Sequence, residues 1–339
     1  MADQILFNER RNGISIWYIK GQSSKPTIVM AKGLQDIPSG EFKWMFLLNC
    51  LGFNVVCASY RGTGDSDGEF IPNATGELSV IEDISNLINF SSEKFHAEEV
   101  YIAAASFGVA PALVASVKYR RIKVSKIVAY AGAIFTDKGG LAEYEKEKAS
   151  NLGEKLLKGD GEFFRGYNGF NLNVWHEIVS GMTELNPYRE EYFPEIAKKH
   201  IFGIHQKNDE EVPYKRTESF FKAIREYCER IGTEPQAKFK LLDDKKGHTD
   251  GFGEKEAIES ASFLTGRSSL SLKTSLIKGL LAIRKYTKRI KRQDGNGCIG
   301  VPFYDAASRQ IEMARERGRL CGPLNEILNK AYSPKSRYL

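Results

Sequence analysis

The feature that most constrains the fold is an alternation of strand-like and helix-like segments along residues 1–265. Segments rich in Val, Ile, Tyr and Phe are typical of buried strands, and they lie at 27–33, 53–59, 99–105, 125–132, 200–206 and 237–243. The longer stretches between them place apolar residues at helical spacing, at 40–52, 76–95 and 214–232. The pair Asn12-Gly13 is a hairpin signal and predicts two antiparallel strands at the start. The alternation predicts an α/β protein with a mostly parallel sheet and helices on both faces.

A wider gap, residues 133–199, interrupts the alternation and predicts a cap inserted into a core formed by 1–132 and 200–265. The gap is marked by aromatic residues, which are Phe135, Phe163, Phe164, Tyr167, Phe170 and Trp175. These rings could form a small core of the cap itself or take part in holding a substrate, and the first interpretation is at least as good as the second.

Charge separates a C-terminal extension, residues 266–339, from the rest of the chain. The extension has 16 Lys and Arg against 5 Asp and Glu, which leaves 33 basic and 38 acidic residues of the totals of 49 and 43 for residues 1–265. Residues 268–292 predict a basic amphipathic helix, whose apolar positions are Leu272, Leu276, Leu280, Ile283 and Ile290. Further helices are predicted over 305–320 and 324–331, on either side of Gly322-Pro323.

Three partners fit this basic extension. Packing on the acidic body or on a second copy of the chain is the preferred interpretation, because it pairs the charges and buries the apolar stripe. A membrane surface comes second, since an interfacial helix also needs a basic face beside an apolar one. Nucleic acid is disfavoured, because Tyr286 is the single aromatic residue of the basic segment.

Composition excludes several other classes of protein. Hydrophobic residues make up 42% and charged residues 27%, which is ordinary for a globular protein. No apolar run reaches the roughly 18 residues of a membrane span, and the first residues lack the order of a signal peptide, so we expect a cytoplasmic protein. Five scattered cysteines and five unpaired histidines predict reduced thiols and no metal site. The sequence has neither a P-loop nor a dinucleotide fingerprint, and we expect no cofactor.

The stretch "YIAAASFGVAPAL" (101–113) places Ser106 between a strand-like and a helix-like segment. A nucleophilic serine on such a strained turn needs small residues two positions before and two after it, and Ala104 and Gly108 meet that need. The alternative is a serine that only caps a helix. By itself the motif does not decide between them.

The stretch "ASYRGTGDSDGEF" (58–70) resembles the Tyr-Arg-Gly-x-Gly-x-Ser loop of the α/β-hydrolase superfamily, and the resemblance covers about residues 14–264. It implies a catalytic Ser, acid and His in that chain order, each following a strand. Ser106 would be the nucleophile, Asp209 in "GIHQKNDEEVP" the acid and His248 in "DDKKGHTDGF" the base. Competing interpretations remain for the acid: Asp209 could cap the helix at 214, and Glu210, Asp243 or Asp244 could replace it.

The same resemblance implies an oxyanion hole formed by the backbone N–H groups of Leu34 and Phe107. Lys32 stands where the superfamily often has histidine, and we expect a solvated loop side chain, or else one that attracts an anionic substrate group. Tyr60 and Arg61 are expected to brace their loop rather than to react.

These residues predict a serine hydrolase that cleaves an ester, thioester or amide acyl bond of a small molecule through an acyl-enzyme on Ser106. The alternatives are an acyltransferase with the same acyl-enzyme, and a non-catalytic binding protein of the same fold. Four other histidines lie outside any motif and are expected at the surface or in packing; they are His96, His176, His200 and His205.

Overall fold

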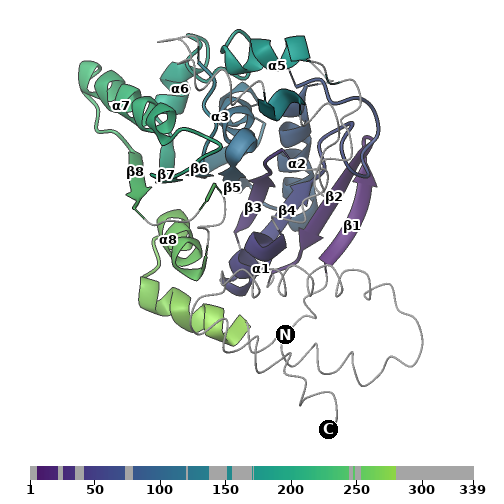
Figure 1. Cartoon of the computed structure of the whole chain (residues 1–339). Helices are drawn as coiled ribbons and strands as arrows, with labels where there is room; N and C mark the ends of the chain where they lie inside the picture. Colours follow the sequence, from purple (N-terminus) through teal and green to yellow (C-terminus); the bar gives the residue numbers. More distant parts are fainter. Residues whose placement is uncertain are drawn as a thin grey trace.

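The computed structural model describes residues 6–21, 26–34, 42–72, 79–119, 121–136, 151–154, 170, 172–243, 247–248 and 253–279. Within them, one eight-stranded sheet lies between two layers of helices (Figure 1). The strands are β1 (Leu6–Arg11), β2 (Ile14–Ile19), β3 (Thr27–Ala31), β4 (Asn54–Ala58), β5 (Glu99–Ala105), β6 (Lys123–Tyr130), β7 (His200–Gln206) and β8 (Ala237–Leu242). The sheet order is β1-β2-β4-β3-β5-β6-β7-β8, and β3 to β8 are parallel. The predicted sheet is confirmed.

The opening hairpin is also confirmed. Its turn residues Asn12 and Gly13 have φ of 50° and 78°, and two positive φ values characterise the tight turn that matches the twist of paired strands. β2 pairs antiparallel with both β1 and β4. The hairpin therefore lies at one side of the sheet, with β1 as the outermost strand, and the parallel strands follow it.

The two faces of the sheet bury different residues, because side chains of a strand alternate between its faces. In β3, Val29 and Ala31 belong to one core, while Ile28 and Met30 belong to the other. The first core is covered by α2 (Val80–Phe95), α3 (Val109–Lys118) and α7 (Tyr214–Arg230). The second core is covered by α1 (Phe42–Cys50) and α8 (Glu254–Thr265). Figure 1 shows these two layers above and below the sheet.

Helix α2 illustrates how the local sequence sets its own ends. The Ser79 hydroxyl accepts a hydrogen bond of 3.1 Å from the Glu82 N–H, which satisfies one donor of the first turn. Glu82 and Asp83 place negative charge at the same end, where the helix dipole favours it. The helix ends at His96, whose φ of 53° is left-handed.

Between β6 and β7 the structure describes residues 151–154, α5 (Leu172–Val179) and α6 (Phe193–Ala197). Three of the aromatic residues predicted for a cap are buried here in the core under α2 and α3; they are Phe135, Phe170 and Trp175. Ring contacts lead from Phe170 to Phe70 at 6.3 Å and from Phe135 to Phe107 at 5.9 Å between centroids. These rings therefore extend the main core next to Ser106. Phe163, Phe164 and Tyr167 lie outside the described residues.

The described part of the C-terminal extension is a helix over residues 269–279. It follows α8, which ends at a left-handed Gly266 with φ of 71°. Leu272 and Leu276 are buried in the core under α1 and α8, whereas Leu270 and Ile277 are exposed. The predicted positions Leu280, Ile283 and Ile290 and the helices over 305–320 and 324–331 lie outside the described residues. In the described ranges, no helix combines the length and apolar character needed to cross a membrane.

A polar contact also holds the start of this extension against the body. The Arg267 guanidinium donates to the Leu51 carbonyl at 3.3 Å, and within the extension it donates to the Ser275 hydroxyl at 2.8 Å. A Cβ atom on Gly279 would lie 2.6 Å from Cβ of Cys50 in α1, which is closer than side chains approach. Residues 269–279 therefore lie against the body at close range.

The cysteines that the structure describes are free thiols, and all three are buried: Cys50, Cys57 and Cys228. Burial raises the pKa of Cys50 to about 12, because the thiolate is poorly solvated there. These thiols are packing residues. Cys298 and Cys321 lie outside the described residues.

Candidate active site

Ser106 directly follows β5 and occupies a strained turn. Its φ is 50°, a left-handed value that few residues other than glycine adopt. A short 3-10 turn, Ser106–Gly108, then leads into α3, so the helix-like segment after Ser106 becomes α-helical only at Val109. Pro111 lies in the first turn of α3, where its missing N–H breaks no hydrogen bond within the helix.

The small residue at position 108 is required by a close approach of two backbones. A Cβ atom on Gly108 would lie 2.4 Å from the carbonyl oxygens of both Ala31 and Lys32, at the end of β3. Any larger residue would push this strand away from the turn. The need for a small residue two positions after the serine therefore has a visible cause, namely the packing of β3 against the turn.

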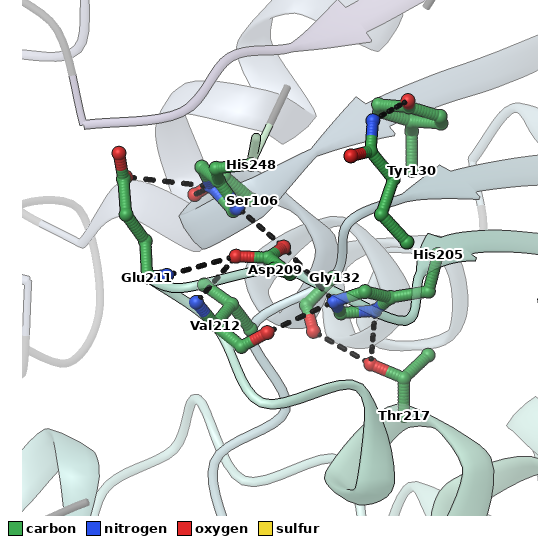
Figure 2. A network of polar contacts seen from close by, with 10 residues as sticks. Ser106, Tyr130, Gly132, His205, Asp209, Glu211, Val212, Thr217 and His248 are labelled. Atoms are coloured by element: carbon green, nitrogen blue, oxygen red, sulfur yellow. Dashed lines mark hydrogen bonds and ion pairs between the residues drawn. The ribbon is translucent and has the colours of Figure 1, made fainter. Parts of the chain in front are cut away.

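The carboxyl ends of β5, β7 and β8 lie at one edge of the sheet, and this edge brings the three predicted site residues together (Figure 2). The Ser106 Oγ lies 2.8 Å from His248 Nε2. His248 Nδ1 lies 2.7 Å from Asp209 Oδ2. The His248 side chain is 8% exposed and that of Asp209 is fully buried. The three side chains form a continuous chain of hydrogen bonds from hydroxyl to carboxylate.

The Asp209 carboxylate is held from two sides. Its Oδ1 accepts hydrogen bonds from the N–H groups of Glu211 and Val212, at 2.9 and 2.8 Å. Its Oδ2 is contacted by His205 and His248, at 3.1 and 2.7 Å. Burial raises the pKa of this carboxyl, but the hydrogen bonds from the two histidines and from the backbone outweigh burial and lower the pKa below its usual range. Asp209 is therefore ionised, and it does not cap α7, whose N-cap is Pro213 without a side-chain hydrogen bond.

The other candidate acids lie elsewhere. Asp243 is exposed and forms an ion pair with Lys207 at 3.4 Å. Glu210 is exposed on the loop, and Asp244 lies outside the described residues. Glu211 was not predicted to have a role, yet its Oε2 lies 3.9 Å from His248 Nε2 with the side chain 67% exposed. A solvated negative charge thus stands beside the imidazole nitrogen that faces Ser106.

The loop after β3 approaches Ser106 closely, as an oxyanion hole requires. A Cβ atom on Gly33 would lie 3.3 Å from Cβ of Ser106, so the chain at residues 33–34 passes directly beside the serine. Leu34 is half-buried at this point, and Phe107 is buried next to the serine. The role of their N–H groups stays a prediction.

Lys32 was expected to be solvated, and that expectation is wrong. The residue is fully buried, and its Nζ lies 4.6 Å from the centre of the Tyr60 ring. The ring face attracts a cation, and the Tyr60 hydroxyl donates to the Lys32 carbonyl at 2.8 Å. Tyr60 therefore braces the loop, and Arg61 does the same through Asp83 of α2, with an Nη2 to Oδ1 distance of 2.9 Å.

His205 is the site residue that sequence reasoning missed. His96, His176 and His200 are exposed, as a surface role predicts, but His205 is fully buried and both ring nitrogens have partners. The available signal was its position near the end of β7, four residues before Asp209. That spacing across a tight loop brings the ring back to the carboxylate.

No group of three or more His, Cys, Asp and Glu side chains in the described part of the chain is placed to bind a metal ion. The contacts at the sheet edge instead pair a hydroxyl with an imidazole and the imidazole with a carboxylate. This arrangement can deprotonate a serine hydroxyl and stabilise the resulting imidazolium.

Comparison with protein-family models finds no match, and comparison with curated proteins finds none either. Solved structures are similar in fold. An esterase from Pyrococcus furiosus is similar with a TM-score of 0.53 at 17% identity, covering 78% of this chain and 91% of its own. A serine hydrolase from Cycloclasticus zankles is similar with a TM-score of 0.51 at 15% identity, covering 78% of this chain and 99% of its own. The sheet order, the strained serine turn and these similarities together show that the chain has the α/β-hydrolase fold.

Proposed function

We propose that this protein is a serine hydrolase that cleaves acyl bonds through a covalent intermediate on Ser106. The observation that carries the proposal is the 2.8 Å contact between Ser106 Oγ and His248 Nε2, made on a backbone turn with a positive φ. A serine hydroxyl is a weak nucleophile until a base removes its proton, and the imidazole is placed to do so. The similar structures named as an esterase and a serine hydrolase add support for hydrolysis.

In the first half-reaction, Ser106 Oγ attacks the acyl carbonyl carbon while its proton passes to His248 Nε2. Negative charge collects on the carbonyl oxygen, where the N–H groups of Leu34 and Phe107 would stabilise it. The imidazolium then protonates the leaving group, the bond to that group breaks, and the acyl group remains on Ser106. Asp209 stabilises the imidazolium and holds its tautomer through the 2.7 Å contact to Nδ1.

In the second half-reaction, His248 removes a proton from water, and the resulting nucleophile attacks the acyl-enzyme. The acid is released and the proton returns to Ser106. Water is the proposed acceptor, since no other one is needed to complete the cycle. Esters, thioesters and activated amides are all compatible with this chemistry, and esters are the first substrates to test.

The test is covalent labelling with a fluorophosphonate probe, followed by mass spectrometric mapping of the modified residue. We expect a single adduct on Ser106 that is lost in Ser106→Ala and retained in Ser180→Ala, a serine outside the site. Steady turnover of short acyl esters without an added acceptor would support hydrolysis. A single burst that resumes only when an alcohol or amine is added would identify an acyltransferase instead, and labelling that persists in Ser106→Ala would refute the proposal.

A further inference from the structure

The buried ring of His205 lies behind Asp209, on the side opposite His248 (Figure 2). Both side chains are fully buried, so a carboxylate here has no contact with bulk water. A buried charge of this kind is unfavourable unless a counter-charge or several donors compensate it. His248 is neutral when it acts as a base, and it therefore supplies no counter-charge before the reaction begins.

The contacts of Nδ1 fix one proton of the His205 ring. This nitrogen lies 3.0 Å from the Thr217 hydroxyl oxygen. The same hydroxyl donates to the Gly132 carbonyl at 2.8 Å, and a carbonyl only accepts hydrogen bonds. Because a threonine hydroxyl has one proton, and that proton is used by Gly132, the hydroxyl must accept from His205. Nδ1 therefore carries a proton.

The contacts of Nε2 fix the second proton. This nitrogen lies 3.0 Å from the Val212 carbonyl and 3.1 Å from Asp209 Oδ2. The carbonyl cannot donate, and the ionised carboxylate cannot donate either. Without a proton, the nitrogen lone pair would face two oxygen lone pairs at hydrogen-bond distance. Nε2 therefore carries a proton as well.

We propose that His205 is a buried imidazolium and acts as a positioning residue, so that the carboxylate of Asp209 lies between one permanently charged histidine and one that becomes charged during the reaction. The described titratable groups that face this centre are Asp209 in direct contact, His248 across the same carboxylate, and the exposed Glu211 beyond His248. The elements packed around the ring otherwise contribute uncharged groups: Thr217 from α7, Gly132 after β6, and Leu241 of β8, which is paired in register with His205.

The imidazolium affects the reaction in two ways, a consequence that rests on the proposed function. The imidazolium holds the carboxylate ionised and oriented before a substrate binds. It also offsets part of the negative charge that would favour protonation of His248, so His248 remains neutral, and competent as a base, at lower pH. His205 thus extends activity toward acidic pH.

The first experiment observes the protons directly and does not depend on activity. The full-length protein is labelled with ¹⁵N-histidine, and the ring nitrogens are recorded at pH 8, where solvent-exposed histidines are neutral because their usual pKa is about 6.5. We expect one ring to show two protonated nitrogens while the exposed rings each show one. The three exposed histidines are assigned by single substitutions that do not threaten the fold, namely His96→Gln, His176→Gln and His200→Gln.

A His205 ring that shows one unprotonated nitrogen at pH 8 would overturn the proposal, whereas His248, the other buried ring, is expected to show one because it is neutral as a base. Thr217→Val supplies the matched test, because it removes the acceptor that requires a proton on Nδ1. In that variant we expect the doubly protonated signal to be absent at pH 8. A signal that persists unchanged would show that Thr217 does not determine the state of the ring.

The second experiment measures the pH dependence of kcat/KM for a short acyl ester. His205→Gln keeps an N–H donor for Asp209 but removes the positive charge. We expect the acidic side of the kcat/KM profile, its acidic limb, to move to higher pH by about one unit. A shift of this size is expected when one of two charges within ~10 Å is removed in a partly polar medium. His200→Gln, on the same strand but exposed, should leave the limb in place. A lower kcat with an unmoved limb would mean that His205 is merely structural.

The two experiments separate this inference from the proposed function. A doubly protonated His205 in a protein whose Ser106 is not labelled by fluorophosphonate would support the proposal of a buried imidazolium and refute the proposed hydrolase function. A labelled Ser106 with a neutral His205 would support the proposed hydrolase function and refute the proposal of a buried imidazolium.

Discussion

Two regions of this molecule are fixed by different physical means. At the carboxyl edge of the sheet, side chains are held by directional hydrogen bonds that run from Ser106 through His248 and Asp209 to His205. On the opposite face of the molecule from α2 and α3, residues 269–279 are held by apolar contact, with Leu272 and Leu276 buried beside α1 and α8. The first region depends on the position of single atoms, and the second on the area removed from water.

This contrast predicts that the two regions fail in different ways. A substitution at the sheet edge should abolish activity while the protein stays folded, because few apolar contacts are lost there. A substitution under residues 269–279 should destabilise the protein while the remaining folded molecules stay active. Substitutions that mix the two effects would show that the regions are coupled.

The largest effect is expected for the nucleophile and the base. Ser106→Ala or His248→Ala should each lower kcat by about 10⁶-fold, and the double variant should be no worse, because in a well-studied triad enzyme each residue acts only as part of the unit. The melting temperature should change little. Kinetics with a short acyl ester and thermal unfolding provide the two measurements, and additive losses in the double variant would argue against a shared mechanism.

Asp209→Asn should have the next largest effect, a loss of kcat of about 10⁴-fold, as for the equivalent change in a well-studied serine protease. The amide donates where the carboxylate accepted, so it favours the wrong tautomer of His248. Asp243→Asn is the matched control, since Asp243 lies near the same edge but is exposed and paired with Lys207. Equal losses in the two variants would mean that Asp209 is not the acid.

The same carboxylate should make stability depend on pH. The pKa of Asp209 is lowered on folding, since the hydrogen bonds from both histidines and the backbone outweigh burial. Its contribution to the free energy of unfolding is therefore complete above the unfolded pKa of about 3.9, and it is lost as pH falls through the lower folded value. The melting temperature of the wild type should fall more steeply below pH 4 than that of Asp209→Asn. Parallel curves for the two proteins would contradict this assignment.

Leu272→Ala tests the apolar region, and the expected loss is about 2–5 kcal/mol in the free energy of unfolding, typical of a fully buried leucine. Denaturant unfolding measures this loss, and kcat of the folded fraction should stay within a factor of two or so. Leu270→Ala is the matched control on the same helix, because Leu270 is 76% exposed. If both variants unfold at the same denaturant concentration, residues 269–279 do not contribute to the stability of the body.

The smallest effect concerns the charge of the substrate. Glu211 places a solvated carboxylate 3.9 Å from His248 Nε2, the atom that protonates the leaving group. An ester with a cationic leaving group should therefore react faster than a neutral ester of the same shape, and Glu211→Gln should reduce that preference by about two- to fivefold. Acetylcholine and 3,3-dimethylbutyl acetate form a suitable pair, with Glu210→Gln as the control. An unchanged preference in Glu211→Gln would show that the Glu211 carboxylate does not interact with the leaving group.

Local features of the chain were predictable from sequence. The Asn12-Gly13 turn, the strands and the small residues around Ser106 depend on neighbours in the sequence, and they appear where they were expected. The motifs around Ser106, Asp209 and His248 also predicted that these residues follow the ends of parallel strands. Strand ends of a parallel sheet share one edge, so the topology brings the three residues to the same edge.

Tertiary structure alone decided which of several similar side chains reached the site. Asp209 and Asp243 both follow strands that end at the site, but only Asp209 is turned inward by the N–H groups of its own loop. Lys32 and His205 carry polar groups that sequence patterns place at the surface or in ordinary packing, and each is buried where other segments compensate it: the Tyr60 ring beside Lys32, and Thr217, Asp209 and Val212 around His205. Sequence periodicity records which residues avoid water, whereas the pairing of buried polar atoms depends on distances between segments that only the folded chain brings together.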